Sequence, residues 1–569
     1  MGYILGINSV YHESAACLLK DGLPVAFVEE ERLSRRKHAK EARVDNPDEL
    51  PWLAIDYCLH EAGITFAEVT AIGYSFNPPK RLRNRGLGEP VISGDWGSEA
   101  GEDLFQQRLS LIPAAISQRA GFDMRDRFHW LDHHLCHAAS AYLASPFSEA
   151  AILAIDGIGE FATAWLGHGE QTRMTSISEI EYPHSLGFLW EKLSVYLGFS
   201  PYDASKVMGL AAYGDPQVFA AGIDTLIRCV DGGRFEVASE ILRFRSGDFQ
   251  LLEELLGPRR KSGEPLEAHH AHIASALQTA TDRVVLHLAA HLRAQTGSRH
   301  LCLAGGVALN CITNRLLQDS GLFDSLYIQP ATHDAGTALG AALLLEHQIP
   351  HGAGRYVQEH AYLGPAYNER EITEALERHG LSYRRTRDPA GEAASLIASG
   401  AIVAWFQGRL EAGPRALGNR SLLADPRRRE MRQTLNEKVK HREDFRPFAP
   451  AVLAEKAEDW FLGAGQSQSS DYMLFAYAAR PERAAQIPAV VHADGTCRVQ
   501  TVRAKTNPLF HRLLVEFNRL TGVPLVLNTS FNDSEPIVCS PDDAVRTFIS
   551  TRIDILIIGD FIVDRRAGL

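Results

Sequence analysis

The sequence predicts an α/β protein with an internally duplicated first domain and a second α/β domain after it. A strand–turn–strand pattern occurs near residues 1–30 and again near residues 150–170. Segments with helical apolar spacing separate the two copies, as in repeated supersecondary units. Beyond a stretch rich in Pro, Gly and polar residues at 347–365, helices and strands alternate anew. The chain of 569 residues is also too long for one domain.

The first copy opens with a strand and a hairpin. Asp21-Gly22 is a dipeptide typical of tight hairpin turns, and apolar runs flank it. Residues 77–103 are rich in Gly, Pro and charge, so we expect a long loop there, of the kind that often covers a substrate. The predicted regular elements are the strands Tyr3–Asn8, Ala16–Lys20, Pro24–Glu29 and Val69–Phe76 and the helix Leu50–Ala62.

The second copy begins with a strand that ends at Asp156-Gly157, and a long amphipathic helix follows at residues 266–296. This helix carries four histidines, which we interpret as a solvated helix face because no carboxylate is spaced with them. They are His269, His270, His272 and His287. The predicted regular elements besides the helix are the strands Ala151–Asp156, Thr163–Gly167, Leu301–Ala304 and Ser325–Gln329 and the helix Gly336–Glu346.

The second domain is expected to hold about 200 residues, an ordinary domain size. Its pattern alternates helices and strands around a polar loop at 463–470. The predicted elements are the helices Glu369–His379, Glu392–Ser399, Leu509–Thr521 and Pro541–Thr551 and the strands Ala401–Phe406, Pro524–Leu527 and Ile555–Ile558.

Composition excludes several functional classes. The net charge of −12 argues against general binding to nucleic acid or to an anionic membrane. Residues 401–450 are the exception, with 11 Lys/Arg against 6 Asp/Glu. The eight cysteines are scattered without a CxxC pair, which is typical of a reducing compartment. Since no apolar run approaches the ~18 residues of a membrane span and no signal peptide is visible, we expect a cytoplasmic protein.

The run Asp132-His133-His134-Leu135-Cys136-His137 is the sharpest local signal. On a helix, His133 and His137 would face the same way one turn apart and could hold one divalent ion. Asp156 at a strand end and Asp334 at a helix start could complete the set, which would suit iron, manganese or zinc. From spacing alone, a hydrogen-bonded pair of core histidines with unrelated aspartates remains the alternative.

Two further segments suggest binding of anionic groups. The strand before Gly305-Gly306 runs into glycines that would let a nucleotide approach the backbone. Lys206 could add a phosphate contact or could be a surface lysine. Asn528–Asn532 follows a buried strand and is either site-forming or a simple Asx-turn.

A basic cluster is interleaved with glycines and therefore fits a preorganised phosphate or carboxylate pocket. The run 427–429 is interpreted as a solvated face. The cluster comprises Arg409, Arg415, Arg420, Lys440, Arg442 and Arg446, with Lys37 as a basic outlier near the N-terminus.

Taken together, these segments resemble the O-carbamoyltransferase family of antibiotic and nodulation-factor biosynthesis, over nearly the whole chain. The motifs that carry the resemblance are GINSVYHESAA, EEERLSRRKH, DHHLCHAASAY, AILAIDGIGE, SKVMGLAAYGD, GGVALNCITN, HDAGTALGAA, EAGPRALGNRSLLADPR, REDFRPFAPAVL, DGTCRVQTV and TGVPLVLNTSFN. One departure follows the last motif, where Asp533-Ser534-Glu535-Pro536 stands in place of the family's Gly-Glu-Pro.

The resemblance implies a TsaD-like domain of the duplicated actin/hexokinase (ASKHA) type at 1–355 and a YrdC-like α/β domain at 356–569. The second domain would make carbamoyl-adenylate from carbamoyl phosphate and ATP. The first would transfer the carbamoyl group to a hydroxyl of a small acceptor and release AMP. The implied cofactor is Fe²⁺, with Mn²⁺ or Zn²⁺ as alternatives, and ATP would enter with Mg²⁺.

The resemblance also assigns residues. It implies His12 as the active-site base and Lys37 as a second catalytic residue. The implied metal ligands are His133, His137, Asp156 and Asp334. The implied nucleotide-binding residues are Lys206, Gly209, Gly305, Gly306 and Asn310. Lys37, Arg415, Lys440, Arg446, Arg498 and Asn528 would surround carbamoyl phosphate and ATP, with Lys37 reaching across from the first domain.

Several alternatives stay open. The same fold could transfer a threonylcarbamoyl group to tRNA or could phosphorylate a sugar, and residues 401–450 could form an RNA-binding patch on a protein without catalysis. The expected partners are ATP, carbamoyl phosphate and a small hydroxylated acceptor, with no membrane and no nucleic acid. A homodimer is a hypothesis, and the sequence does not identify the acceptor.

Overall fold

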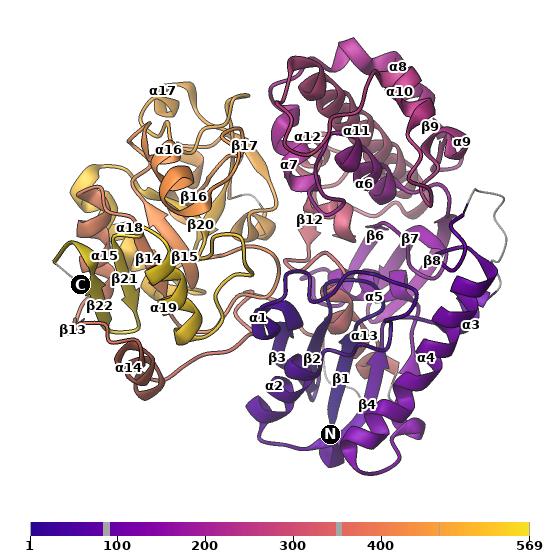
Figure 1. The fold of residues 1–569 in the computed structure, drawn as a ribbon, viewed down its shortest axis with the longest axis horizontal. Helices are drawn as coiled ribbons and strands as arrows, with labels where there is room; N and C mark the ends of the chain where they lie inside the picture. Colours follow the sequence, from indigo (N-terminus) through magenta and orange to yellow (C-terminus); the bar gives the residue numbers. More distant parts are fainter. Residues whose placement is uncertain (1, 83–90, 349–354, 466, 568–569) are drawn as a thin grey trace. The chain divides into compact units, whose positions relative to one another are not determined.

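The computed structural model describes residues 2–82, 91–348, 355–465 and 467–567. It divides into two compact units (Figure 1), one formed by residues 1–30 and 38–358 and the other by residues 31–37 and 359–569. The predicted loops at 77–103 and 463–470 and the predicted boundary at 347–365 fall partly outside the described residues.

Two five-stranded sheets of the first unit have the same strand order, β3-β2-β1-β4-β5 and β8-β7-β6-β11-β12. In each sheet the central strand pairs antiparallel with a hairpin and parallel with the next strand. This repeat confirms the internal duplication and gives the actin/hexokinase-type arrangement. The strands are β1 Tyr3–Asn8, β2 Ala15–Lys20, β3 Leu23–Glu29, β4 Val69–Tyr74, β5 Phe128–Trp130, β6 Glu149–Ile155, β7 Ala162–Glu170, β8 Arg173–Glu181, β11 His300–Ala304 and β12 Ser325–Ile328.

The hairpin prediction is confirmed at its turn, since Asp21 and Gly22 have φ values of 52° and 80°. Both residues are in the left-handed region that such a turn requires. The outer strand β8 was not predicted. Most of its side chains are exposed, so it lacks the apolar alternation that marks a strand in the sequence.

Helices α5 (His133–Tyr142) and α13 (Gly336–Gln348) lie between the two sheets. α13 packs on β1 and β2, α5 packs on β6 and β11, and the two helices pack on each other (Figure 1). Glycine makes this contact close, because a Cβ added at Gly340 would lie 1.8 Å from the carbonyl oxygen of Cys136. The packing therefore fixes the register between α5 and the residues that precede α13.

Replacing Gly340 by valine is expected to destabilise the first unit. The new side chain would overlap the backbone of α5, and overpacking of this kind costs about 1–3 kcal/mol or more. Urea denaturation of the full chain measures the loss. Gly247→Ala is the matched control, because a Cβ there meets nothing within 4 Å. Equal stability of the two variants would contradict the close packing.

The predicted loop at 77–103 is wrong at both ends. Helix α3 occupies Pro78–Leu82, and helix α4 begins at Glu99 and continues to Ala120. The Ser98 hydroxyl accepts a hydrogen bond from the Gly101 backbone and caps α4. The apolar stripe that identifies α4 lies at Phe105, Leu109, Ile112 and Ile116, beyond the predicted window.

The remaining elements of the first unit surround these layers. Long helix α11 is Ala268–Thr296 and matches the predicted helix. The others are α2 Trp52–Ala62, α6 Leu186–Tyr196, α7 Ala204–Ala211, α8 Ala220–Leu226, α9 Ser239–Leu242, α10 Gln250–Leu256, α12 Cys311–Asp319, β9 Ile227–Val230 and β10 Arg234–Val237.

The second unit contains a mixed eight-stranded sheet in the order β13-β22-β21-β14-β15-β20-β16-β19 and a two-stranded sheet β17-β18. Its strands are β13 Arg384–Arg385, β14 Val403–Phe406, β15 Arg420–Ala424, β16 Ala449–Leu453, β17 Ala476–Ala478, β18 Thr496–Arg498, β19 Gln500–Val502, β20 Leu525–Ser530, β21 Ile555–Ile558 and β22 Phe561–Asp564. Its helices are α14 Glu369–Arg378, α15 Pro389–Ala398, α16 Met431–Leu435, α17 Pro481–Ala484, α18 Pro508–Thr521 and α19 Pro541–Ser550.

A short N-terminal segment, residues 31–37, belongs to this second unit. It includes most of α1 (Glu30–Ser34). The Arg35 guanidinium donates to the carbonyls of Ile537 at 2.7 Å and Pro536 at 2.6 Å. The segment is thereby tied to the turn that follows β20. In the described part of the chain, no helix combines the length and apolar character that crossing a membrane requires.

Candidate active site

Four side chains from three parts of the first unit converge on one point. His133 and His137 lie one turn apart on α5, Asp156 follows β6, and Asp334 precedes α13. The two imidazole Nε2 atoms lie 3.4–3.6 Å from Oδ2 of Asp156 and Oδ1 of Asp334. One ligand atom from each of the four side chains falls within 4.8 Å of the others. The structure therefore brings together the predicted metal set.

The surroundings orient these ligand atoms. The Nδ1 of His133 lies 3.1 Å from the Ser75 carbonyl and donates to it, which leaves the Nε2 lone pair for a metal. The backbone N–H of Gly306 donates to Oδ1 of Asp156 at 2.9 Å and leaves Oδ2 toward the histidines. Glu160 accepts from the His133 backbone N–H at 2.9 Å, so it caps α5 in place of Asp132.

The electrostatics of the set call for a cation. Burial disfavours an imidazolium at His133. The carboxylates of Asp156 and Asp334 have the larger, opposite effect, so the pKa of His133 is raised well above its ordinary value. Burial opposes ionisation of Asp156, yet the two histidines hold its pKa well below the ordinary value. Both Nε2 atoms are buried without a hydrogen-bond partner among the described residues. Two neutral imidazoles and two carboxylates fit a divalent first-row metal, which would take the place of the proton that the carboxylates favour on His133.

The glycines of the predicted nucleotide segment lie directly beside this set. Gly305 has φ = 87°, and a Cβ there would lie 2.1 Å from the Ile155 carbonyl. Only glycine permits this approach of the backbone to the end of β6. Together with the bond from Gly306 to Asp156, it joins the segment to the candidate metal centre.

The other predicted nucleotide residues have structural partners in this structure. The Lys206 ammonium lies 3.1 Å from Asp203, and Gly209 is buried within α7. The Asn310 side chain caps α12 by accepting from the N–H groups of Ile312 and Thr313 at 3.2 Å. Their nucleotide-binding roles stay predictions.

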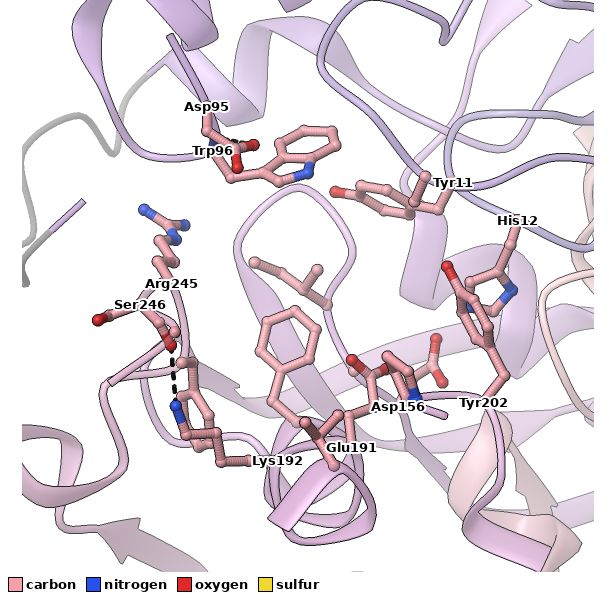
Figure 2. Close-up of a pocket in the computed structure, with 18 of the residues that line it drawn as sticks. Tyr11, His12, Asp95, Trp96, Asp156, Glu191, Lys192, Tyr202, Arg245 and Ser246 are labelled. Carbon is pink, nitrogen blue, oxygen red and sulfur yellow. Dashed lines mark hydrogen bonds between the residues drawn. The ribbon is translucent and has the colours of Figure 1, made fainter. Parts of the chain in front are cut away.

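A cavity of about 480 Å³ opens beside the candidate metal centre. Figure 2 shows His12 and Tyr202 next to Asp156 and Glu191 at one end, with Arg245 and Ser246 farther away. His12 Nδ1 is buried and has no hydrogen-bond partner among the described residues. The residues lining this part are His12, Asp156, Glu191, Tyr202 and Asp334. His12 and the two carboxylates of the metal set, Asp156 and Asp334, thus face one cavity.

Glu191 was missed by the sequence analysis. It lies on α6, which approaches closely because a Cβ at Gly187 would be 2.6 Å from the Gly157 backbone nitrogen. Burial, with the charges of Asp156 and Asp334, raises the pKa of Glu191 to about 8. The available signal was the carboxylate of Glu191 beside Lys192 in the mostly apolar run LGFLWEKL.

The raised pKa of Glu191 leads us to expect that the free energy of unfolding of the metal-free protein depends on pH. Its pKa of about 8 exceeds the ordinary 4.5, so wild type is most stable relative to Glu191→Gln below pH 4.5. This advantage is lost as the pH rises toward 8, by up to about 1.4 kcal/mol per unit, and then levels off. Urea denaturation of both proteins at several pH values measures the difference. A pH-independent difference would contradict the burial of this carboxyl.

The second unit concentrates positive charge around Arg442. Burial, with the nearby guanidinium groups of Arg446 and Arg498, lowers the pKa of Arg442 to about 9. Burial, Arg442 and Arg446 also hold the pKa of Lys440 well below its ordinary value. Glu443, 3.8 Å from Arg446, offsets only part of this charge. An excess of buried positive charge is typical of a site for an anion.

Asn528 and Arg415 are connected to this cluster through the backbone. The Asn528 amide donates to the Ala416 carbonyl at 3.2 Å and to Gln500 at 2.8 Å. Its Oδ1 is buried without a hydrogen-bond partner among the described residues. Arg415 precedes Ala416, and Arg498 lies two residues before Gln500 on the adjoining strands. Asn528 on β20 thus links the loop after Arg415 to β19 of the eight-stranded sheet, whereas Arg498 ends β18 of the two-stranded sheet.

Lys440 and Lys37 differ from their predicted settings. The Lys440 ammonium donates to the Ser530 carbonyl at 2.6 Å and to two Asn532 oxygens at 2.8 Å, so it holds the turn after β20. In the same turn, the carboxylate of Glu535 accepts from the Asp533 backbone N–H at 3.1 Å. Lys37 is exposed and belongs to the segment that packs with the second unit.

Two members of the predicted basic cluster have structural roles instead. Arg420 is fully buried, donates to the Gln407 carbonyl at 2.6 Å, and stacks 3.6 Å from the Phe406 ring. Arg409 donates to the carbonyls of Leu363 and Gly364. Sequence spacing could not reveal these carbonyl partners, and a place for either residue in a substrate pocket stays a prediction.

The histidines of α11 are not a uniformly solvated face. His270 is 5% exposed, and His272 and His287 are partly buried. His272 accepts from the Asp215 backbone, and His287 contacts the Val230 carbonyl. None of them belongs to a metal-competent group among the described residues.

Comparison with known protein families identifies the class. Residues 3–80 and 91–343 match the family domain described as Carbamoyltransferase N-terminus, and residues 394–565 match Carbamoyltransferase C-terminus. The chain therefore belongs to the carbamoyltransferase family and is a transferase enzyme.

Relatives of similar length support this assignment. The chain is 38% identical over 610 residues to uncharacterized protein sll1178 of Synechocystis, covering 100% of this chain and 97% of that protein. It is 37% identical over 566 residues to nodulation protein NolNO of Sinorhizobium fredii, covering 99% and 80%. It is 30% identical to nodulation protein U of Rhizobium tropici, covering 93% and 90%.

Solved structures share lower similarity. A structure of full-length HypF in the phosphate- and nucleotide-bound form has a TM-score of 0.33 at 13% identity, covering 62% of this chain and 56% of HypF. The ROK hexokinase of Thermus thermophilus has a TM-score of 0.29 at 16% identity, covering 61% and 99%. At such scores the assignment of fold depends on the repeated strand order described above.

Proposed function

We propose that the protein is an ATP-dependent O-carbamoyltransferase that makes carbamoyl-adenylate and transfers its carbamoyl group to a hydroxyl of a small acceptor. The observation that carries this proposal is the four-residue set of His133, His137, Asp156 and Asp334, whose two carboxylates line the same cavity as His12. The basic cluster around Arg442 supplies the second requirement, a site for phosphate-bearing substrates.

The first half-reaction is assigned to the domain at 356–569, with the N-terminal segment that carries Lys37. Carbamoyl phosphate and water give carbamate and phosphate, and the carbamate oxygen then attacks the α-phosphorus of ATP. Carbamoyl-adenylate forms and pyrophosphate leaves. Arg415, Arg446 and Arg498 are proposed to neutralise the charge that develops on the phosphoryl oxygens. Lys440 orients the turn that carries Asn532.

The second half-reaction is assigned to the domain at 1–355. His12 is proposed to remove the proton of the acceptor hydroxyl, whose oxygen attacks the carbamoyl carbon while AMP leaves. The Gly305-Gly306 backbone is proposed to approach the adenylate. An iron(II) ion bound by the four-residue set, or manganese or zinc in its place, would polarise the carbamoyl carbonyl and anchor the phosphate. Glu191 would donate a hydrogen bond inside the cavity.

A pyrophosphate assay without acceptor tests the proposal. The full chain is incubated with ATP, Mg²⁺ and carbamoyl phosphate, and with carbamoyl phosphate omitted as the control. Pyrophosphate that depends strictly on carbamoyl phosphate is the expected result. Absence of pyrophosphate from protein that binds ATP would overturn the first half-reaction and favour a sugar kinase of the same fold.

A further inference from the structure

We infer that the cavity of the first unit selects an uncharged, hydroxylated ring compound with an apolar or aromatic face, and that it discriminates against polycationic acceptors such as aminoglycosides. This inference rests on the proposed function, and it adds the chemical class of the acceptor. It is carried by the aromatic walls of the cavity and by the way its charged residues are already paired.

One wall is built from packed aromatic rings. The ring of Trp96 lies 5.7 Å from that of Tyr11 and 4.9 Å from that of Phe105. Two hydrogen bonds fix the loop that bears Trp96. The backbone N–H of Trp96 donates to the Asp95 carboxylate at 2.7 Å, and the backbone N–H of Gly97 donates to the Glu102 carboxylate at 2.8 Å. A ring held in this way presents its surface to a ligand with little loss of conformational freedom.

The opposite wall is also aromatic. The Phe188 and Phe244 rings pack 5.7 Å apart, and Phe249 lines the same side. Figure 2 shows Trp96 on one side of the cavity and Lys192 on the other. The apolar and aromatic side chains that line the cavity are Tyr11, Ile92, Trp96, Ile158, Phe188, Val195, Tyr202, Phe244 and Phe249. Its volume of about 480 Å³ is in the range of sites for drug-sized ligands.

Two basic residues of the lining, Lys192 and Arg81, have polar protein partners. The Lys192 ammonium donates to the carbonyls of Ser246 at 2.9 Å and Asp248 at 3.0 Å, and it lies 4.0 Å from the Phe249 ring. Arg81 forms a buried pair with Glu102, with N–O distances of 2.6 and 2.8 Å. These groups keep positive charge near the cavity without presenting a free ionic ligand.

Negative charge is scarce along the described lining. Outside the candidate metal centre, Asp95 and Glu191 are the two acids among the described lining residues. Arg245 lies on the same lining, and its guanidinium packs 4.2 Å from the centre of the Tyr182 ring. A polycation would therefore lose hydration without gaining matching carboxylates.

Binding of three probes to the full chain tests the inference. Calorimetric titration compares phenyl β-glucoside, methyl β-glucoside and tobramycin at physiological ionic strength. Phenyl glucoside is expected to bind about tenfold more tightly than methyl glucoside, the scale of one aromatic contact. Tobramycin is expected to bind more weakly than phenyl glucoside. Tightest binding by tobramycin, or no binding by phenyl glucoside, would overturn the inference.

Two variants locate the effect in the cavity. Trp96→Ala should remove most of the tenfold advantage of the phenyl group, whereas Tyr213→Ala, at an exposed ring outside the lining, should retain it. Arg245→Glu should strengthen tobramycin binding. Because this variant removes no aromatic ring, it still tests the inference if Trp96→Ala fails to fold. An unchanged preference in Arg245→Glu and in a folded Trp96→Ala would contradict the assignment.

The pyrophosphate assay on the same preparations separates this inference from the proposed function. If pyrophosphate release depends on carbamoyl phosphate but the cavity prefers tobramycin, the inferred acceptor class is wrong and the proposed first half-reaction stands. If no pyrophosphate is released but the cavity prefers phenyl glucoside, the proposed first half-reaction is wrong and the preference of the cavity is established.

Discussion

His137→Ala is expected to lose bound metal and carbamoyl transfer while still releasing pyrophosphate from ATP and carbamoyl phosphate. The imidazole Nε2 lies 3.4 Å from Asp156 and 3.5 Å from Asp334, so its removal leaves two buried carboxylates facing one histidine. Removal even of an outer-shell partner typically lowers metal affinity about 10–100-fold, and loss of a ligand should exceed this. Mass-spectrometric metal analysis and AMP release measure the two effects.

His129→Ala is the matched control for this variant. His129 is an exposed histidine on β5 and is not part of the four-residue set. It should bind metal as wild type does. Full metal occupancy with undiminished transfer in His137→Ala would show that the four-residue set is a structural cluster and not a catalytic centre.

Arg446→Ala is expected to reduce carbamoyl-phosphate-dependent pyrophosphate release about 10²–10³-fold, the range for loss of one electrostatic contact to a transition state. Arg446 contributes to the positive field that lowers the pKa of both Lys440 and Arg442. The metal content of the first unit should be unchanged. A pyrophosphate assay at saturating ATP measures the effect.

Arg429→Ala serves as the matched control, because Arg429 is exposed in the plain charge run 427–429. Loss of the same positive charge there should leave pyrophosphate release within a small factor of wild type. Equal activity of Arg446→Ala and wild type would show that this cluster is not the site of adenylate formation.

The sequence predicted the local features of the fold well. The turn at Asp21-Gly22 and the strands beside it depend on neighbouring residues, so a local pattern was sufficient. The repeated strand order depends on pairings between distant strands, such as β6 with β11. Helix α4 was missed because Gly101 and Pro113 interrupt its pattern while its burial is decided by tertiary packing.

The candidate site was only partly predictable from residue patterns. The i, i+4 spacing of His133 and His137 predicted a shared face of α5, which the structure has. Nothing local connects Asp334 with these histidines, since the approach of α13 to α5 at Gly340 decides their distance. Glu191 was missed for a similar reason, because its raised pKa depends on burial and on charges distant in sequence.

Detection of the labelled intermediate tests the central claim most directly. The full chain is incubated with ATP and ¹³C-carbamoyl phosphate without acceptor, and the quenched mixture is analysed by mass spectrometry. We expect ¹³C-labelled carbamoyl-adenylate from wild type and from His137→Ala, and none above background from Arg446→Ala. Absence of both pyrophosphate and labelled adenylate from mixtures with folded, ATP-binding wild type would contradict the proposed function.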